Sequence, residues 1–389
     1  VISEYKITEN LKYIKQIFPY LGRREIIVLK GIRRAGKSTI VKQLIAETIA
    51  KGAEPKQILY LNLEDYNFAN SLKIELFEEI LQAYKNYTKN KKKIYFFIDE
   101  AQKIQGWEKW VRTKYELNEP IKFIVTGSSA SLLTKELSTL LTGRNVSFNI
   151  MPLSYSEFLN FNKGSSLNEY LQFGGFPEVV LEKSEEKKKF ILGSYFEDMI
   201  YKDIIDRHNI RNAKQLMEIA RYLISTSGSK VSVNKLSKIF GLSKDTISLY
   251  IGYMIDACIL FEVTYFSFSA KVKHDITKLH KLYALDNGLI NISTIKYSKN
   301  TGQMFENTVL IKLVEGFKEI SYWSEDKSEV DFIVDKMAIN VTATNEIPIR
   351  EIDGLKNFNA KYQNFSNLLI TKSATKDSQI SIKDFLLKD

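Results

Sequence analysis

Residues 31–39, which read GIRRAGKST, place the tightest limit on what this chain can fold into. They have the spacing G-x-x-x-x-G-K-[ST] and directly follow the apolar run Ile26–Leu29. That run predicts a buried strand, and the residues after the loop have the periodicity of a helix. A strand, a glycine loop and a helix in this order aim backbone N–H groups and a helix N-terminus at one anion. The sequence therefore predicts a phosphate-binding loop.

Each residue type in the loop has a physical role. Gly31 and Gly36 allow the tight turn, Lys37 reaches the terminal phosphates of a nucleotide, and the Ser38 hydroxyl ligates Mg²⁺. The residues expected to line this site are Gly31, Ile32, Arg33, Arg34, Ala35, Gly36, Lys37, Ser38 and Thr39. The side chains of Arg33 and Arg34 either add positive field or face water, and the sequence leaves both open.

The composition bounds the class of protein. The chain has 389 residues, 44% of them hydrophobic, which is enough for two or three packed domains. The net charge of +10 favours an anionic partner, nucleic acid before a membrane surface, although a lysine-rich composition without such a partner is the alternative. Cys258 is the single cysteine, so no intrachain disulfide forms. No apolar stretch approaches the roughly 18 residues of a membrane span, and we expect a cytoplasmic protein.

Three segments follow one another along the chain. Residues 1–150 alternate apolar runs with helical patterns, which predicts a parallel sheet with helices on both faces. Residues 151–285 are mostly helical in pattern, and residues 286–389 mix helix and strand. The strands predicted in the first segment are Ile26–Leu29, Ile58–Leu63, Ile94–Ile98 and Phe123–Thr126.

Two adjacent carboxylates end the third of these strands, in KIYFFIDEAQ. Ligands bind at the carboxyl ends of strands in an open parallel sheet. We expect Asp99 to hold Mg²⁺ and Glu100 to polarise a water molecule for attack on the γ-phosphate. The intervening strand 58–63 predicts that the glycine-loop strand and the Asp-Glu strand are not neighbours in the sheet.

The next strand ends in hydroxyl groups, and an arginine follows. Thr126 or Ser128 either senses the γ-phosphate or belongs to a strand-to-helix turn. Arg144 either stabilises charge on the transferred phosphoryl group, in its own chain or in a second copy, or faces solvent or an acidic partner. The sequence does not decide between these alternatives.

The motifs GIRRAGKST, FFIDEAQ, TGSSASLL with LTGR, MPLSYSEF and FGGFPEVV together resemble a prokaryotic family of AAA-type ATPases. The resemblance covers nearly the whole chain. It implies a P-loop ATPase module, a winged-helix region and a C-terminal domain similar to PD-(D/E)xK nucleases. It also implies ATP binding and Mg²⁺-dependent hydrolysis.

A helix-turn-helix pattern lies in the second segment. Val233–Phe240 has helical spacing, GLS forms a turn, and a second helical pattern follows. Residues 260–283 then predict a β-hairpin wing. The residues expected to contact DNA are Lys244, Thr246, Tyr250, Lys271 and Lys273. A helical hairpin that packs domains or docks a protein is the alternative.

The third segment carries an incomplete nuclease pattern. Glu306 lies on a predicted helix and Asp331 on a predicted strand. In the fold that this domain resembles, the next strand supplies an acidic residue and, two positions on, a lysine. Here these positions are Asn340 and Thr342, and Lys336 is the nearby lysine that could substitute. A lone carboxylate binds Mg²⁺ poorly, so we predict a structural or binding remnant and disfavour an active nuclease.

The leading hypothesis is an ATP hydrolase that acts as a motor or switch, on DNA through its winged helix. A nucleotide-gated DNA-binding regulator with little turnover and a protein-binding scaffold are the alternatives. A protein partner and a second copy of the chain remain open as partners, and no membrane partner is expected.

Overall fold

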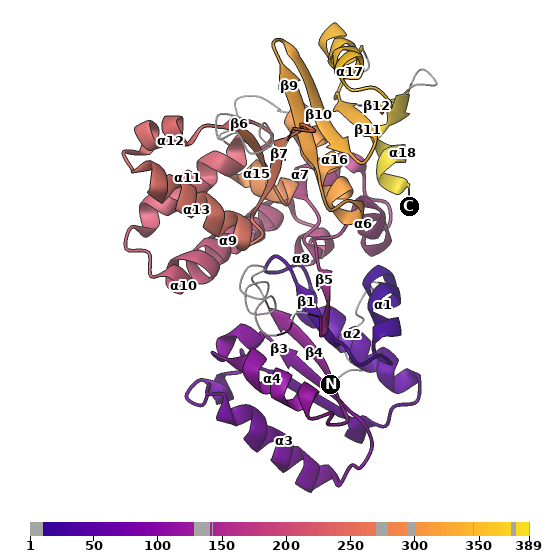
Figure 1. The fold of residues 1–389 in the computed structure, drawn as a ribbon, viewed down its shortest axis with the longest axis vertical. Coiled ribbons are helices and arrows are strands. Elements are labelled where there is room, and N and C mark those ends of the chain that lie inside the picture. The colour runs from indigo at the N-terminus through magenta and orange to yellow at the C-terminus, as the bar shows by residue number, and fades with distance from the viewer. Residues whose placement is uncertain are drawn as a thin grey trace. The chain divides into compact units, whose positions relative to one another are not determined.

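A computed structural model describes residues 11–127, 141, 143–269, 279–294, 301–344, 346–374 and 379–388. The chain divides into two compact units, Val1–Met151 and Pro152–Asp389, which can be followed by colour in Figure 1. Each unit is described by itself below. The predicted boundary at residue 150 lies next to this division.

The first unit is an α/β fold on a parallel sheet. Its strands are β1 (Ile26–Lys30), β2 (Ile58–Asn62), β3 (Ile94–Asp99), β4 (Ile121–Gly127) and β5 (Asn145–Asn149). Their order is β2-β3-β4-β1-β5, and every pairing is parallel. Because β4 lies between β1 and β3, the prediction that the glycine-loop strand and the Asp-Glu strand are not neighbours is confirmed.

Helices cover both faces of this sheet. They are α1 (Leu11–Ile17), α2 (Lys37–Ala50), α3 (Glu75–Thr88) and α4 (Trp107–Glu116), with short 3₁₀ turns at Phe18–Tyr20, Pro55–Gln57, Tyr66–Phe68 and Ala101–Lys103. Figure 1 shows α1 and α2 on one side and α3 and α4 on the other. Strands buried on both faces need continuous apolar runs, and the first four residues of β1 are all buried.

The strand ends bring the candidate residues to one edge of the sheet. Leu29 pairs with Thr126, and Ile98 pairs with Val125, so β1, β3 and β4 end at the same level. The glycine loop follows β1 at this edge. Gly31 has a φ of +147°, and a Cβ there would lie 2.0 Å from the carbonyl oxygen of Ile150. Glycine is therefore required where the loop leaves the strand.

The helices of the second unit are spread along its whole length. They are α6 (Tyr155–Phe161), α7 (Leu167–Phe173), α8 (Pro177–Leu181), α9 (Glu185–Ile200), a π-helical turn (Tyr201–Ile205), α10 (Asp206–His208), α11 (Ala213–Ser225), α12 (Val233–Phe240), α13 (Lys244–Asp256), α15 (Asn287–Ser293), α16 (Thr301–Gly316), α17 (Ile349–Lys361) and α18 (Ile382–Leu387). The predicted helix-turn-helix corresponds to α12 and α13. Gly241, with φ of +65°, ends α12, and the Ser243 hydroxyl caps α13 by accepting from the Thr246 N–H at 3.1 Å.

One eight-stranded sheet runs through the second unit. Its strands are β6 (Lys230–Val231), β7 (Leu260–Tyr265), β8 (His280–Ala284), β9 (Ser321–Glu325), β10 (Ser328–Val334), β11 (Met337–Val341), β12 (Ser366–Thr371) and β13 (Gln379–Ser381). Their order is β13-β12-β11-β10-β9-β7-β8-β6. The parallel pairing of β7 with β9 joins strands from both sides of residue 285. The boundary predicted there does not separate two compact units.

A buried carboxylate ties two turns of this unit together. Asp286 accepts hydrogen bonds from the N–H groups of Gly175 at 2.7 Å and Gly288 at 2.8 Å. Gly174 has a φ of +73°, and a Cβ there would lie 1.9 Å from the Asp286 carboxylate. The Leu153 N–H donates to the Gly175 carbonyl at 2.7 Å. The motifs MPLSYSEF and FGGFPEVV therefore meet around one buried acid, which gives their glycines a packing role.

This acid makes the stability of the second unit depend on pH. Burial raises the pKa of Asp286 from 3.8 to about 7, and the N–H groups of Gly175 and Gly288 oppose the shift. The folded state binds the proton more tightly, so its contribution is present at low pH and is lost as pH rises through 7, by up to about 4 kcal/mol. We expect Asp286→Asn to flatten the fall in stability between about pH 4 and 7, measured by urea denaturation with hydrogen exchange of α15 peptides. The exposed control Asp245→Asn should keep the wild-type slope, and an equal slope in Asp286→Asn would contradict the assignment.

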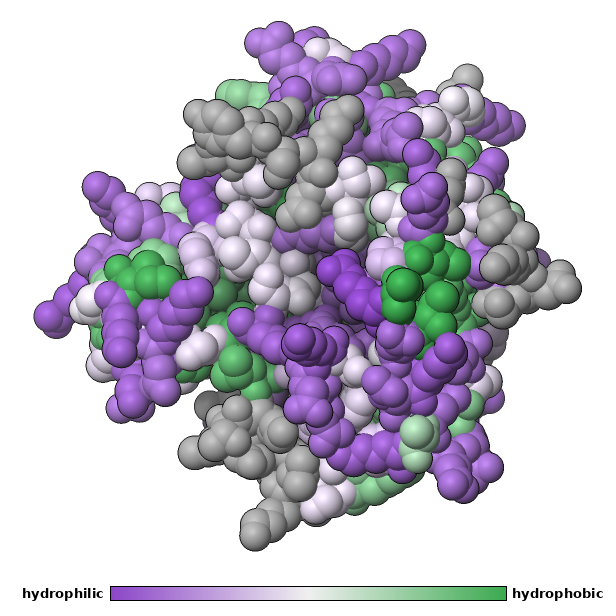
Figure 2. All heavy atoms as spheres, turned by 90° about the horizontal axis from the view of Figure 1, so that it is seen from above, coloured by the Kyte–Doolittle hydropathy of each residue, from purple (hydrophilic) through white to green (hydrophobic). Residues whose placement is uncertain are grey.

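The face drawn in Figure 2 is mainly hydrophilic. Figure 2 shows one face, on which hydrophobic side chains gather in small separate patches among charged ones. Among the described residues, the large exposed hydrophobic side chains include Tyr66, Phe190 and Ile349. Such scattered residues are normal for a protein surface.

Candidate functional site

The glycine loop and the start of α2 hold a buried ammonium group. Gly36, with φ of +94°, precedes the 14-residue helix α2, which begins at Lys37. Lys37 is 5% exposed, and its Nζ donates to the carbonyls of Gly31 at 3.1 Å and Ile32 at 2.9 Å. These two carbonyls hold the ammonium across the loop. A phosphate oxygen is a stronger acceptor, so this ammonium is placed for an anion.

Asp99 is fixed by two hydroxyl groups from neighbouring strands. Tyr60 on β2 donates to Oδ2 at 3.0 Å, and Thr126 on β4 donates to Oδ1. The Asp99 side chain is buried. Two donors that act on separate oxygens orient a carboxylate and leave its remaining lone pairs as acceptors. Thr126 thus positions Asp99, and Ser128, the other predicted sensor, lies outside the described residues.

Glu100 stands at the end of β3 in a left-handed conformation, with φ of +59°. Its N–H donates to the Thr126 hydroxyl at 3.0 Å, and its carboxylate accepts from the side-chain amide of Gln102. Burial raises the pKa of Glu100. The positive charges of Lys37 and Arg33 oppose that shift, whereas the negative charge of Glu64 adds to it. A carboxylate with a raised pKa holds a proton more tightly than usual, which suits it to accept one from water.

The residues at this edge fit a magnesium-bound triphosphate by their chemistry. The loop N–H groups and Lys37 provide donors for phosphate oxygens. Ser38 is half-buried at the start of α2, and its hydroxyl and the Asp99 carboxylate are oxygen ligands of the kind that Mg²⁺ prefers. Ile32 and Ala35 are buried, so they act through their backbone, whereas Arg34 and Thr39 are exposed.

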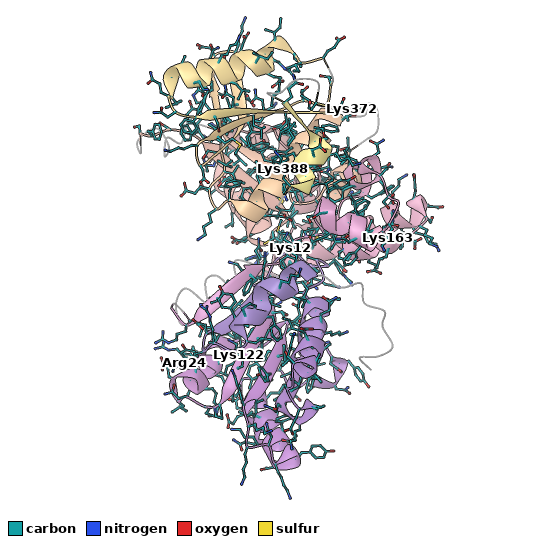
Figure 3. All side chains as sticks on the ribbon, turned by 90° about the vertical axis from the view of Figure 1, so that its right-hand side faces the viewer. Lys12, Arg24, Lys122, Lys163, Lys372 and Lys388 are labelled. Carbon is teal, nitrogen blue, oxygen red and sulfur yellow. The ribbon has the colours of Figure 1, made fainter. Side chains whose placement is uncertain are left out.

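Arg144 lies at the opposite edge of the sheet. Its carbonyl accepts from the Ile26 N–H at 2.8 Å, and its guanidinium Nη2 lies 3.0 Å from Glu116 Oε1. The whole length of β1, five residues, separates this edge from the glycine loop, which is roughly 15 Å at about 3.3 Å per residue. Arg24 and Lys122 mark the same edge in Figure 3. The structure therefore does not bring Arg144 to the site of its own chain.

Of the residues predicted to contact DNA, Lys244 is exposed and Tyr250 is buried. Lys244 is exposed at the start of α13, and the Thr246 hydroxyl bonds to Ser243 at 2.8 Å. Tyr250 is 9% exposed on the inner face of α13, so its prediction as a groove-facing side chain is wrong. It lies one turn from Ile247, which is also buried, and both belong to the packing stripe of the helix. Lys271 and Lys273 lie outside the described residues.

A cavity of about 990 Å³ lies in the second unit. Its lining combines acidic, basic and hydroxyl side chains. The charged residues that line it are Glu306, Glu329, Asp331, Glu351, Lys327, Arg350 and Lys372. The loop Ser225–Ser229, which precedes β6, also contributes to the lining. The cavity is therefore lined by residues 225–229 on one side and by residues of β10, β11 and α17 on the other.

Lys281 on β8 is an ammonium group shared by three acidic residues beside this cavity. Its side chain is 3% exposed, and its Nζ lies 2.7 Å from Glu329, 3.2 Å from Glu306 and 3.6 Å from Asp331. Burial lowers the pKa of Lys281, but the negative charges around it outweigh burial and hold the pKa well above its ordinary value. Burial and the charge of Glu306 raise the pKa of Asp331, against the opposing effect of Lys281.

The positions of the missing nuclease residues have other partners. The Asn340 side chain accepts from the Asp331 N–H at 3.0 Å and donates to the carbonyls of Glu329 at 3.2 Å and Glu351 at 2.9 Å. It therefore ties β10, β11 and α17 together. Lys336, suggested as a substitute lysine, is exposed in the β10–β11 turn, so that suggestion is wrong. Lys281 is the lysine beside Asp331.

Sequence reasoning missed Tyr60, Lys281 and Asp286. The sequence does indicate Lys281, because a lysine in the otherwise apolar run KLYAL needs a buried partner. No sequence pattern indicates Tyr60, since its contact with Asp99 depends on the pairing of β2 with β3.

In the described ranges, no cluster of three or more His, Cys, Asp or Glu side chains is arranged to hold a metal ion. No helix among the residues that the structure describes is long and apolar enough to cross a membrane.

Comparison with protein families adds two matches. The family described as "AAA domain" matches residues 23–159, and a domain of unknown function matches residues 164–300. The structure of AMPPCP-bound DnaA from Aquifex aeolicus aligns with 63% of this chain and 87% of its own, at 15% identity and a TM-score of 0.33.

Two curated relatives cover most of the chain. The uncharacterized protein MJ1544 of Methanocaldococcus jannaschii is 33% identical over 362 residues, which span 86% of this chain and 78% of that protein. An uncharacterized protein of Haemophilus influenzae is 30% identical over 386 residues, which span 95% and 94% of the two chains. The chain therefore belongs to the same family as these two proteins, and its first unit is an AAA-type P-loop ATPase domain.

Proposed function

We propose that the chain binds ATP with Mg²⁺ and hydrolyses it, and that turnover drives a motor or switch. The observation that carries this proposal is the convergence of four groups at one edge of the sheet. The loop amides, the buried ammonium of Lys37, the oriented carboxylate of Asp99 and the buried carboxylate of Glu100 come from β1, α2 and β3. Such an arrangement suits phosphoryl transfer to water.

Each residue of the proposed ATP site has a separate role. Lys37 exchanges the carbonyls of Gly31 and Ile32 for phosphate oxygens, and the loop N–H groups hold the phosphate chain in place. Ser38 and Asp99 would hold Mg²⁺, which neutralises phosphate charge when bound. Glu100 accepts the proton of the attacking water at its carboxylate, and Thr126 fixes the backbone of Glu100 and the side chain of Asp99.

The proposal is tested by phosphate release from ATP with and without Mg²⁺. We expect wild-type protein to release phosphate in the presence of Mg²⁺ and Lys37→Ala to release none above background, because the ammonium that meets the phosphates is gone. Lys51→Ala, which removes an exposed lysine just after α2, is the matched control and should keep wild-type activity. Turnover in Lys37→Ala equal to wild type would contradict the proposal.

Second, we propose that the region Ala213–Ala284 is a winged helix that contacts DNA. Its described elements follow the order α11, β6, α12, α13, β7 and β8, and β8 pairs antiparallel with both β6 and β7. Lys235, Lys238 and Lys244 are exposed on α12 and α13 and are available for phosphates. This order and this charge support the proposal.

Duplex DNA affinity measured at several salt concentrations tests this second proposal. Phosphate contacts make affinity fall steeply with salt, and Lys244→Ala should weaken binding and reduce the slope of log K against log salt by about 1. Lys163→Ala removes an exposed lysine after α6 and serves as the control. Absence of DNA affinity at physiological salt would favour the protein-binding scaffold.

Third, we propose that residues 286–389 are a remnant of a nuclease-like fold that no longer cleaves nucleic acid. The order α16, β9, β10, β11, α17, β12, with β11 and β12 parallel, supports the fold. The structural bonds of Asn340 and the ion pairs of Lys281 with Glu306 and Asp331 support the loss of activity.

A further inference from the structure

The edge strand β2 holds Asp99 by both its backbone and its side chain. β2 pairs in parallel with β3, and Asn62 is the partner of Asp99 in this pairing. Because side chains alternate along a strand, Tyr60 lies on the same face of the sheet as Asn62. The Tyr60 hydroxyl donates to Asp99 Oδ2 at 3.0 Å, and the Leu63 N–H donates to the Asp99 carbonyl at 3.1 Å. The position of Asp99 therefore depends on a tyrosine outside the glycine loop and outside the Asp-Glu strand.

Two hydroxyl groups limit how this carboxylate can meet a cation. Thr126 donates to Oδ1 from β4 and Tyr60 donates to Oδ2 from β2, so each oxygen gives one lone pair to a hydrogen bond. The Asp99 side chain is 1% exposed, and the strands on either side of it keep both donors in place. A cation that takes both oxygens at once must compete with both donors. A cation that takes one oxygen, or a water molecule bound to it, competes with one donor at most.

Resting on the proposed ATPase function, we propose that Tyr60 is a positioning residue that makes this site prefer Mg²⁺ to Ca²⁺. Mg²⁺ keeps several water molecules and needs few carboxylate oxygens, whereas Ca²⁺ takes about six to eight oxygens and accepts carboxylates through both of theirs. The Tyr60 hydroxyl ties Oδ2 to β2, so Asp99 does not present both oxygens to one cation. Such a ligand suits Mg²⁺ and leaves Ca²⁺ short of oxygens.

A purely structural role is the competing explanation for Tyr60. Its ring is half-buried on β2, and a side chain that only packs there would stabilise the sheet without acting on the metal. The two explanations differ in what they predict for metal preference. Only a role that acts through Oδ2 of Asp99 changes the affinity for Mg²⁺ relative to Ca²⁺.

The test is titration calorimetry of ATP in the presence of Mg²⁺, of Ca²⁺, and of a chelator that removes both. We expect the wild-type chain to favour Mg²⁺ over Ca²⁺ by more than ATP alone does in solution. Tyr60→Phe keeps the ring and removes the hydroxyl, and it should lower this preference by about tenfold, the smaller of the losses typical when a partner of a metal ligand is removed. ATP affinity in the chelator should stay at the wild-type value, because the loop amides and Lys37 are unchanged.

Two further variants separate the metal from the fold. Tyr84→Phe is the matched control, because it removes a phenol hydroxyl that donates to the Lys56 carbonyl, just before β2, and it should keep the wild-type preference. Asp99→Asn replaces the ligand itself. In that background Tyr60→Phe should cause no further change in metal affinity, because the two changes act on one interaction. A full additional loss there would assign Tyr60 to the fold and overturn the inference.

The outcomes separate this inference from the proposed function. Wild-type protein that binds ATP with either metal, at the ratio of ATP alone, would overturn the role of Tyr60 without any variant and leave the ATPase proposal standing. Tyr60→Phe with the wild-type preference would overturn it in the same way. Wild-type protein that binds ATP with neither metal would overturn the proposed function and this inference together.

Discussion

Replacing Glu100 by glutamine is expected to lower ATP turnover by about 10²–10⁴-fold, the range typical of losing a general base, while ATP still binds with Mg²⁺. Glutamine keeps the size of the side chain and the backbone bond to Thr126, but its amide cannot accept the proton of the attacking water. Lys37, Ser38 and the loop amides are unchanged, so the phosphate site remains. Single-turnover phosphate release and calorimetric ATP binding measure the two effects separately.

Glu79→Gln is the matched control for this variant. Glu79 is exposed on α3, so the same change of charge there should leave kcat and ATP affinity at wild-type values. If Glu100→Gln hydrolysed ATP at the wild-type rate, Glu100 would not be the base. If it lost ATP binding as well, its role would be in holding the nucleotide.

The pH dependence of turnover follows from the same carboxylate. Burial raises the pKa of Glu100 above its ordinary value. Turnover needs the ionised form, so activity should appear as pH rises through this raised pKa. The acid limb of the wild-type rate profile should therefore lie above the ordinary glutamate pKa of about 4.3. The small residual rate of Glu100→Gln should lack that limb.

Replacing Lys281 by methionine should destabilise the second unit by about 3–5 kcal/mol at pH 7.5, because a buried charge partner is removed. Methionine fills a similar space, but Glu306, Glu329 and Asp331 then face one another without the ammonium. Glu329 keeps a second partner, Lys230, at 2.7 Å. Urea denaturation of the full chain, followed by hydrogen exchange of peptides from β8 and β10, measures the change.

The destabilisation should shrink as the solution becomes more acidic. Without Lys281 the pKa of Asp331 rises further, so the folded variant binds a proton more tightly than the unfolded chain. Its stability is then recovered at low pH and lost as pH rises through the raised pKa. Lys327→Met, an exposed lysine that lines the same cavity, is the control. A Lys281→Met protein as stable as this control at pH 7.5 would contradict the account.

The parts of the fold that local patterns encode could be predicted from the sequence. The run Ile26–Leu29, the glycine loop and the helix after it are adjacent in the chain, and the spacing fixes their geometry. Asp99 follows its strand directly, so its place at the carboxyl edge needs only the parallel sheet. The Gly241 turn and the Ser243 cap are local in the same way.

The contacts that depend on sheet pairing could not be predicted. Lys281 meets Asp331 because β7 pairs with β8 on one side and with β9 on the other, and no local pattern encodes that register. Sequence order leaves open whether Arg144 reaches the loop, and only the parallel pairing of β5 with β1 puts it at the amino edge. Tyr250 has a polar hydroxyl group, but it lies one helical turn after Ile247 and therefore belongs to the buried face of α13.

The central claim is that the loop amides, Lys37, Asp99 and Glu100 form one site for ATP with Mg²⁺. Titration calorimetry of the folded full chain with ATP in the presence of Mg²⁺ tests it most directly. The account predicts saturable binding that weakens when Mg²⁺ is chelated and disappears in Lys37→Ala. Wild-type protein that binds neither ATP nor ADP at millimolar concentrations would contradict it.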